Sequence, residues 1–178
     1  MQVVSPTQFL KQARKPVVVP VPYFEQETEF TCGPAVLKMI MHYFGENIAE
    51  RRLRKHTKSS PLGGTNHEKL ISTVQTLGYH CFVKQNAQPR HLKSFINRGY
   101  PIIINWQEPD TKDGHYSVIF GYLSEYFFMH DPYKPTRKVL PTQTLLPLWH
   151  DGGQQHWFMV TSKDKIRTSL KGKCYLPR

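Results

Sequence analysis

The order of hydrophobic patterns along the chain restricts its fold more than any other feature. Up to about residue 100, apolar residues recur at helical spacing, as they do from Val36 to Phe44. From Pro101 onward they form short runs between turn residues, such as Ile102 to Trp106, and such runs predict strands. Helices followed by antiparallel strands are typical of the α+β class. We therefore expect an N-terminal helical half packed against a C-terminal antiparallel β-sheet.

Three glycines mark the ends of the longer predicted helices. Gly45, Gly78 and Gly99 each follow an apolar helical run, where a residue free to adopt positive φ ends a helix well. The helices are expected over residues 32–44, 47–56, 65–77, 89–98 and 142–149, and strands over 79–84, 102–106, 115–122, 125–130 and 156–160. The β-rich stretch from Val17 to Phe24 contains two prolines and is therefore expected at an edge or as an extended lead-in.

The length of 178 residues predicts one domain with a sizeable core. A hydrophobic content of 39% and a charged content of 21% are typical of a globular chain. We expect an N-terminal arm over residues 1–16, the folded domain over 17–162 and a basic C-terminal tail over 163–178.

The charge balance indicates what the surface binds. Against 13 acidic residues stand 24 lysines and arginines, a formal net charge of +11, which favours acidic partners. The basic residues concentrate at 51–55 and 163–173 without interleaved aromatic residues, so we expect no dedicated nucleic-acid site.

Cysteine and histidine spacing argues against cross-links and metals. Cys32, Cys81 and Cys174 are odd in number and widely separated, which disfavours a disulfide framework and a paired-cysteine zinc site. The nine histidines form no HExxH pattern, and we expect neither a metal nor another cofactor. No signal peptide and no apolar run of transmembrane length is visible, so the default expectation is a cytoplasmic protein.

Cys32 lies where a loop gives way to an apolar helical run. The positive end of the helix dipole favours a thiolate at such a position, as an activated nucleophile requires. A free cysteine is also commonly a small buried hydrophobic residue. The local sequence alone leaves both interpretations open.

Other residues supply the groups that a nucleophilic cysteine needs. His115 begins a predicted strand and offers a base, and Asp131 ends the paired strand and offers a group to orient that base. Gln26 precedes Cys32 by six residues and offers an amide donor for an oxyanion. Each has an ordinary structural explanation alone, but together they favour catalysis. Trp106, at a strand end, and Gly114, beside His115, are the candidates for substrate contacts.

Four segments together resemble the C39-type peptidases, a papain-like group of bacterial cysteine peptidases. They are Val21 to Gln26, Thr31-Cys32-Gly33-Pro34-Ala35, Gly114 to Val118 with Gly121-Tyr122, and His130-Asp131-Pro132. The similarity extends from about Val17 to about Val160. The best-known members of this family are the N-terminal domains of peptide-exporting transporters, where they cut leader peptides after a double glycine.

The resemblance implies a papain-like fold and a cysteine peptidase acting on a peptide or protein. It implies Cys32 as nucleophile, His115 as general base and acid, Asp131 as the orienting residue and Gln26 as oxyanion donor. Thr31 stands where many relatives have an acidic residue, which bears on substrate preference. Two alternatives stay open: acyl or peptidyl transfer by the same residues, and a non-catalytic papain-like module that binds peptides.

Overall fold

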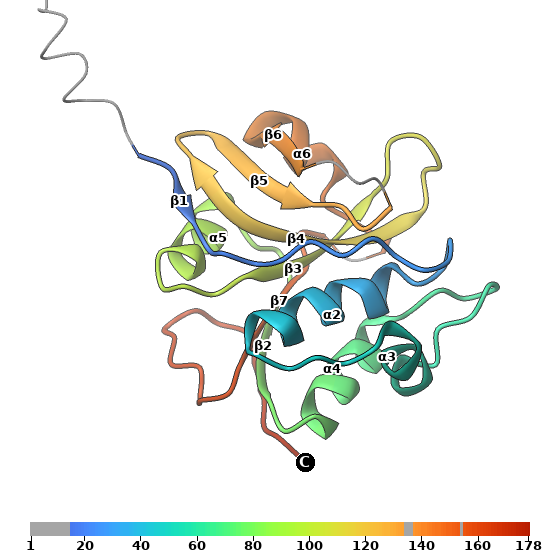
Figure 1. Cartoon of the computed structure of the whole chain (residues 1–178). Helices are drawn as coiled ribbons and strands as arrows, with labels where there is room; N and C mark the ends of the chain where they lie inside the picture. The colour runs from blue at the N-terminus through green and yellow to red at the C-terminus, as the bar shows by residue number, and fades with distance from the viewer. Residues whose placement is uncertain (1–14, 134–136, 154) are drawn as a thin grey trace, which may run out of the picture.

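A single antiparallel sheet organises the part of the chain that the structure, a computed structural model, describes: residues 15–133, 137–153 and 155–178 (Figure 1). Its strands lie in the order β6-β5-β4-β3-β7-β2-β8, and β1 pairs with β4. The strands are β1 (Val17–Val18), β2 (His80–Lys84), β3 (Ile102–Gln107), β4 (Gly114–Leu123), β5 (Tyr126–His130), β6 (Arg137–Pro141), β7 (Phe158–Ser162) and β8 (Lys173–Tyr175).

The helices are α2 (Cys32–Tyr43), α3 (Glu50–Thr57), α4 (His67–Thr76), α5 (Pro89–Ile96) and α6 (Thr142–Leu148). Figure 1 shows α2 between the sheet and the pair α3 and α4, and it contacts both β4 and α3. The expected α+β class is thus confirmed, with mixed helices and an antiparallel sheet.

Helix α2 is the central helix of the fold. Nearly every residue from Cys32 to Met41 is buried, as expected for a helix apolar around most of its circumference. Pro34 lies in the first turn, where a residue without an N–H costs no helical hydrogen bond. The helix ends before Gly45, which has a φ of +87° and closes the last turn. Gly78 and Gly99 also have positive φ after α4 and α5, so the three predicted helix ends are confirmed.

The segment that leads into α2 is held by contacts with β4, with β5 and with the residues that follow β5. β1 pairs with β4, and this approach needs Gly121, because a Cβ there would lie 2.7 Å from the carbonyl oxygen of Val17. Further along, the Nε2 atom of His130 lies 3.0 Å from the carbonyl oxygen of Val21, and the N–H of Gln26 donates to the carbonyl of Pro132 at 2.9 Å. The loop before Cys32 is therefore anchored to the ends of β4 and β5.

The sheet is larger than the sequence pattern indicates. β2, from the helical half, joins the sheet by pairing with β7, because its run from Cys81 to Val83 is buried between α4 and the neighbouring strands. The sequence analysis did not foresee β6 and β8. They are the outer strands of the sheet, where Arg137–Pro141 pairs with β5 and Lys173–Tyr175 pairs with β2. β8 lies within the stretch expected as a basic tail.

Candidate active site

Cys32 is the first residue of α2 and is 8% exposed. The preceding turn is fixed by Thr28 and Thr31, since the N–H of Thr28 donates to Thr31 Oγ1 and that hydroxyl donates to the carbonyl of Thr28. Gly33 lies against Thr65, so close that a Cβ there would meet the threonine side chain at 2.6 Å. The thiol is thus held where the first backbone N–H groups of a helix have no helical partner.

Glu50 supports this turn from α3. Its carboxylate accepts a hydrogen bond from the N–H of Glu27 at 2.8 Å, and the side chain of Thr31 is near enough to lower the pKa of the carboxyl group. Burial raises the pKa of Glu50, while the hydrogen bonds lower it less than burial raises it. Thr31 therefore has beside it a carboxylate that comes from another helix, α3.

His115 and Asp131 meet where β4 begins and β5 ends. β4 pairs with β5, and His115 Nε2 donates to Asp131 Oδ1 across 2.7 Å. Asp131 also accepts from the N–H of Tyr133 at 3.0 Å and is fully buried. The Cys32 side chain interacts with the same imidazole, and because Nε2 is taken by Asp131, Nδ1 is the ring nitrogen left for it.

The charges of this group reinforce one another. Burial would lower the pKa of His115, but the hydrogen bonds with Asp131 and Cys32 raise it to about 9. Burial would raise the pKa of Asp131, but its bonds with His115 and Lys138 bring it to about 2. At neutral pH His115 is therefore an imidazolium between the Cys32 sulfur and a carboxylate, an arrangement that activates a nucleophile.

Lys138 is a member of this group that the sequence analysis missed. It lies on β6 opposite Met129, a buried residue, so its side chain points inward from an outer strand. Its Nζ lies 2.6 Å from Asp131 Oδ2 and 4.9 Å from the centre of the Trp106 ring. No sequence pattern marked it, because from Arg137 to Leu140 two basic residues precede two apolar ones and do not alternate with them.

Gln26 lies next to the group, but its amide is engaged locally. Its Nε2 donates to the carbonyl of Thr28 at 2.8 Å, and its side chain is not part of the cavity wall around Cys32. The anchoring of its backbone to Pro132 keeps Gln26 between the turn before α2 and the residue after Asp131.

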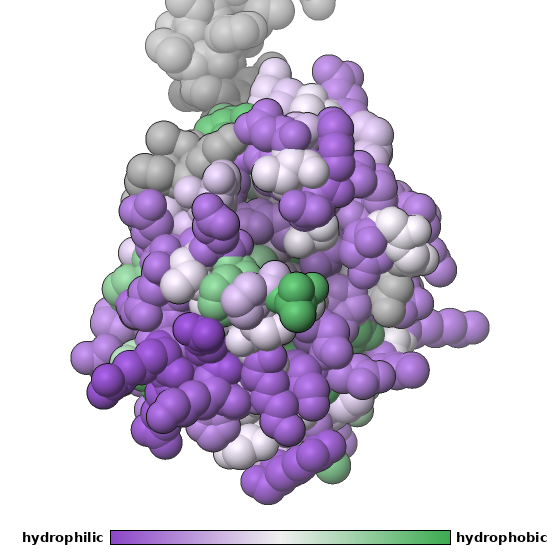
Figure 2. Space-filling model, turned by 90° about the vertical axis from the view of Figure 1, so that its right-hand side faces the viewer, coloured by the Kyte–Doolittle hydropathy of each residue, from purple (hydrophilic) through white to green (hydrophobic). Residues whose placement is uncertain are grey.

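A cavity of about 620 Å³ opens at Cys32 and His115. Its walls come from the loop before α2, the loop at residues 61–65 and the loop at 108–114, and they include Gly114. Figure 2 views the molecule from the side on which these loops project in Figure 1, and this face is mainly hydrophilic with a few hydrophobic groups near its centre.

Trp106 is placed differently from the sequence expectation. It is 1% exposed, its Nε1 donates to Ser117 Oγ at 2.9 Å, and it does not line this cavity. The strand-end position is correct, but the side chain turns into the core beneath Lys138 rather than toward a groove.

A second histidine–carboxylate pair lies on the other side of Gly114. His67 Nε2 lies 3.1 Å from Asp151 Oδ2, and its Nδ1 accepts a hydrogen bond from the hydroxyl of Tyr116 at 2.6 Å. The ring stacks on Trp157 with centroids 3.9 Å apart. Burial lowers the pKa of His67 more than Asp151 raises it, so this imidazole is neutral at neutral pH.

Within residues 15–133, 137–153 and 155–178, no three histidine, cysteine, aspartate or glutamate side chains are grouped so that they could hold a metal ion. No helix in this described part of the chain is long and apolar enough to cross a bilayer.

Solved structures define the class of this fold: it is the fold of C39 peptidase domains. The peptidase domain of Streptococcus ComA, a bifunctional transporter of a quorum-sensing pathway, matches with a TM-score of 0.65 and 19% identity over 79% of this chain and 97% of that domain. A double glycine motif protease from an AMS/PCAT transporter, solved with the leader peptide, matches with a TM-score of 0.66 and 20% identity over 82% of this chain and 96% of that protein. A C39-like peptidase from Bacillus anthracis matches with a TM-score of 0.68 and 17% identity over 85% of this chain and 100% of that protein.

The sequence itself gives the family. The chain belongs to the Peptidase_C39 like family, whose model matches residues 18–156. The resemblance found from the motifs is thereby confirmed. A comparison with curated proteins found no match.

Proposed function

We propose that this chain is a cysteine peptidase that hydrolyses peptide bonds through an acyl-enzyme formed on Cys32. The observation that carries the proposal is the shared imidazole: His115 is bonded to Asp131 on one side and to Cys32 on the other, at the mouth of a cavity. Membership of the Peptidase_C39 like family supports it.

In the first half of the reaction, the Cys32 thiolate attacks the scissile carbonyl carbon, and the carbonyl π electrons move to the oxygen. The N–H of Cys32 and the amide of Gln26 stabilise this oxyanion. One Nε2 proton of Gln26 is bonded to the carbonyl of Thr28, so the second is the one left for the oxyanion, and the amide has to turn toward a cavity that it does not line in this structure. His115 then gives its proton to the leaving amine, the C–N bond breaks, and a thioester remains.

In the second half, His115 removes a proton from water, and the hydroxide attacks the thioester. The C–S bond breaks, the carboxylic acid leaves, and the thiolate returns beside the imidazolium. Asp131 keeps Nε2 of His115 protonated, so that Nδ1 faces the thiol throughout.

A peptide is the proposed substrate. The double glycine motif protease that shares this fold was solved with a leader peptide, and the cavity here is large enough to admit an extended segment of chain. The basic outer surface leaves acidic protein partners as a further expectation for regions outside the cavity.

The test is a peptide library incubated with the protein and with its Cys32→Ala variant, with cleavage positions identified by mass spectrometry. We expect cleavage by the unmodified protein and a loss of turnover to background in the variant, with matching thermal unfolding curves. Full activity in the variant would exclude Cys32 as the nucleophile. Repeating the reaction with an added amine distinguishes hydrolysis from acyl transfer, because transfer yields the aminolysed product.

A further inference from the structure

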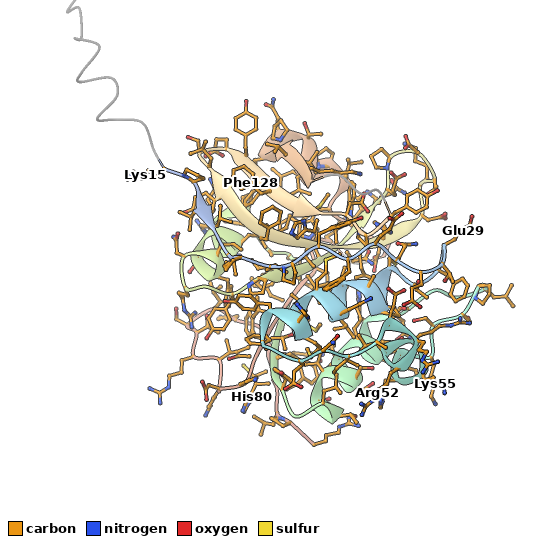
Figure 3. All side chains as sticks on the ribbon, viewed as in Figure 1. Lys15, Glu29, Arg52, Lys55, His80 and Phe128 are labelled. Carbon is orange, nitrogen blue, oxygen red and sulfur yellow. The ribbon has the colours of Figure 1, made fainter. Side chains whose placement is uncertain are left out.

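The charge of the cleft is opposite to the charge of the molecule. Among the described residues, three carboxylates line the cavity at Cys32: Glu29, Glu108 and Asp113. Two more, Glu68 and Asp151, line a cavity of about 480 Å³ beside it. No described lysine or arginine lines either cavity, although the chain has 24 of them. Figure 3 shows Arg52 and Lys55 on the outer side of α3, away from Glu29 at the edge of the cleft.

Two cations near Phe30 and Asp131 are already engaged. Arg54 stacks over Phe30 with 4.6 Å between its guanidinium and the ring centre, and Lys138 is paired with Asp131. The second cavity, which we call the side pocket, is lined by Thr65, Asn66, His67, Glu68, Asn105, Gly114, Tyr116 and Asp151.

The side pocket adjoins the reacting groups. It shares Thr65, Gly114 and Tyr116 with the cavity that contains Cys32 and His115. Gly114 and Tyr116 point to one face of β4, and His115 between them points to the other. Gly114 has no positive φ, so its small size is what matters: it leaves an opening beside Asn105 and Asp151, each 3.7 Å from where a Cβ would stand.

A buried amide oxygen faces this pocket without a partner. Asn105 is 5% exposed, lies opposite Tyr116 in the β3–β4 pairing and hydrogen-bonds its hydroxyl. Because that bond lowers the pKa of Tyr116, the amide nitrogen donates it, and the Oδ1 atom is left with no hydrogen-bond partner among the described residues. A buried acceptor of this kind indicates a ligand that donates.

The neighbouring groups add negative charge rather than cancel it. Asp151 accepts a hydrogen bond from the N–H of Gly153 and lies 3.1 Å from His67 Nε2, but His67 is neutral, so the carboxylate charge is not offset by this histidine. Glu68 is exposed at the rim. An amide oxygen and two carboxylates around one opening match an ammonium or guanidinium group.

We propose that the side pocket binds a cationic group of the substrate, the side chain of a lysine or arginine near the scissile bond. This inference rests on the proposed peptidase function and names its substrate class. Asn105 Oδ1 and the Asp151 carboxylate accept hydrogen bonds from the cation, and Glu68 adds attraction at the rim. The net charge of +11 thus belongs to the outer surface and does not describe the substrate.

The binding test does not depend on turnover. In the Cys32→Ala background, fluorescence anisotropy would compare peptides that carry lysine, norleucine or acetyl-lysine at each position of a cleavable sequence. We expect lysine to bind about tenfold more tightly at one position, as a charge-assisted hydrogen bond allows, and less so as salt is added. An N-acetylated series shows whether a free N-terminal amine supplies the cation instead; if only that amine mattered, the assignment to a side chain would be overturned.

Variants then locate the effect. Asp151→Asn and Glu68→Gln should reduce the preference for lysine, the first by about tenfold and the second by less. Asp164→Asn, the same change at an exposed carboxylate beyond β7, is the matched control and should leave it unchanged. Equal binding of lysine and norleucine peptides everywhere overturns this inference and leaves the peptidase proposal standing. Absence of cleavage with lysine-selective binding would instead refute the peptidase proposal alone.

Discussion

Two histidine–carboxylate pairs flank the start of β4, and their environments give them opposite charge states. His115 is bonded to Asp131 and Cys32, and its pKa rises to about 9. His67 is bonded to Asp151 and stacked on Trp157, and its pKa falls. The difference lies in what surrounds the same two functional groups: a nearby thiol and a fully buried carboxylate hold the proton on one ring, while burial removes it from the other.

The comparison teaches that a histidine beside an aspartate is not by itself a catalytic signal. His115 can deliver a proton because it holds one at neutral pH next to a thiol. His67 is a neutral ring that accepts from Tyr116 and lies 3.1 Å from Asp151, which suits recognition rather than proton transfer. The two pairs can be separated experimentally.

The largest effect should come from replacing each histidine by asparagine in turn. His115→Asn removes the acid and base and should lower kcat by at least about 10³-fold. His67→Asn should change kcat/KM by less than about tenfold, mainly through KM for peptides with a lysine. Steady-state kinetics with one lysine peptide and its norleucine analogue gives both values, and thermal melts check the fold. Comparable losses of kcat in the two variants would contradict the division of roles.

The two histidines should make the free energy of unfolding depend on pH in opposite directions. The pKa of His115 is raised in the folded state, so its contribution is complete below pH 6.5 and lost as the pH rises through about 9, on the order of 3 kcal/mol. The pKa of His67 is lowered, so its contribution is complete above pH 6.5 and lost as the pH falls through the folded value.

Urea unfolding between pH 5 and 10 measures this. The free energy of unfolding should fall toward both ends of the range in the unmodified protein. His115→Asn should flatten the alkaline side and His67→Asn the acid side. An alkaline slope that survives in His115→Asn would show that another group is responsible.

The sequence was sufficient for the parts of the site that local patterns define. Cys32 before an apolar run and His115 at a strand start are local features, and the structure places both at one cavity. The helix ends at Gly45, Gly78 and Gly99 were also predictable, because a single residue determines each of them.

What could not be predicted depends on register and on side-chain direction. Lys138 reaches Asp131 only because β6 pairs with β5 so that residue 138 lies opposite Met129. Trp106 was expected at a groove from its position at a strand end, but the hydrogen bond to Ser117 turns it inward. Asn105 and Asp151 are far apart in the chain, and no local pattern marks either as part of a pocket.

The smallest predicted effect concerns Lys138, which distinguishes the two pairs further because no described cation lines the side pocket around Asp151. An ammonium bonded to Asp131 weakens the hold of that carboxylate on the His115 proton. Lys138→Met should therefore raise the pKa of His115 further and move the alkaline limb of the kcat/KM profile to higher pH by about one unit. The opposite direction, or no movement, would mean that Lys138 serves packing against Trp106 only.

Two further variants make this reading specific. Lys138→Arg keeps the charge and should restore the position of the alkaline limb, even if the larger head group alters kcat. Lys93→Met removes another lysine that is paired with a carboxylate, Glu125, at 2.9 Å and is similarly shielded, with 23% of its side chain exposed against 20% for Lys138. That pair lies away from His115, so its loss should leave the limb in place. A shift common to both methionine variants would reflect the overall charge of the protein, whereas a shift confined to Lys138→Met identifies a charge that acts through Asp131.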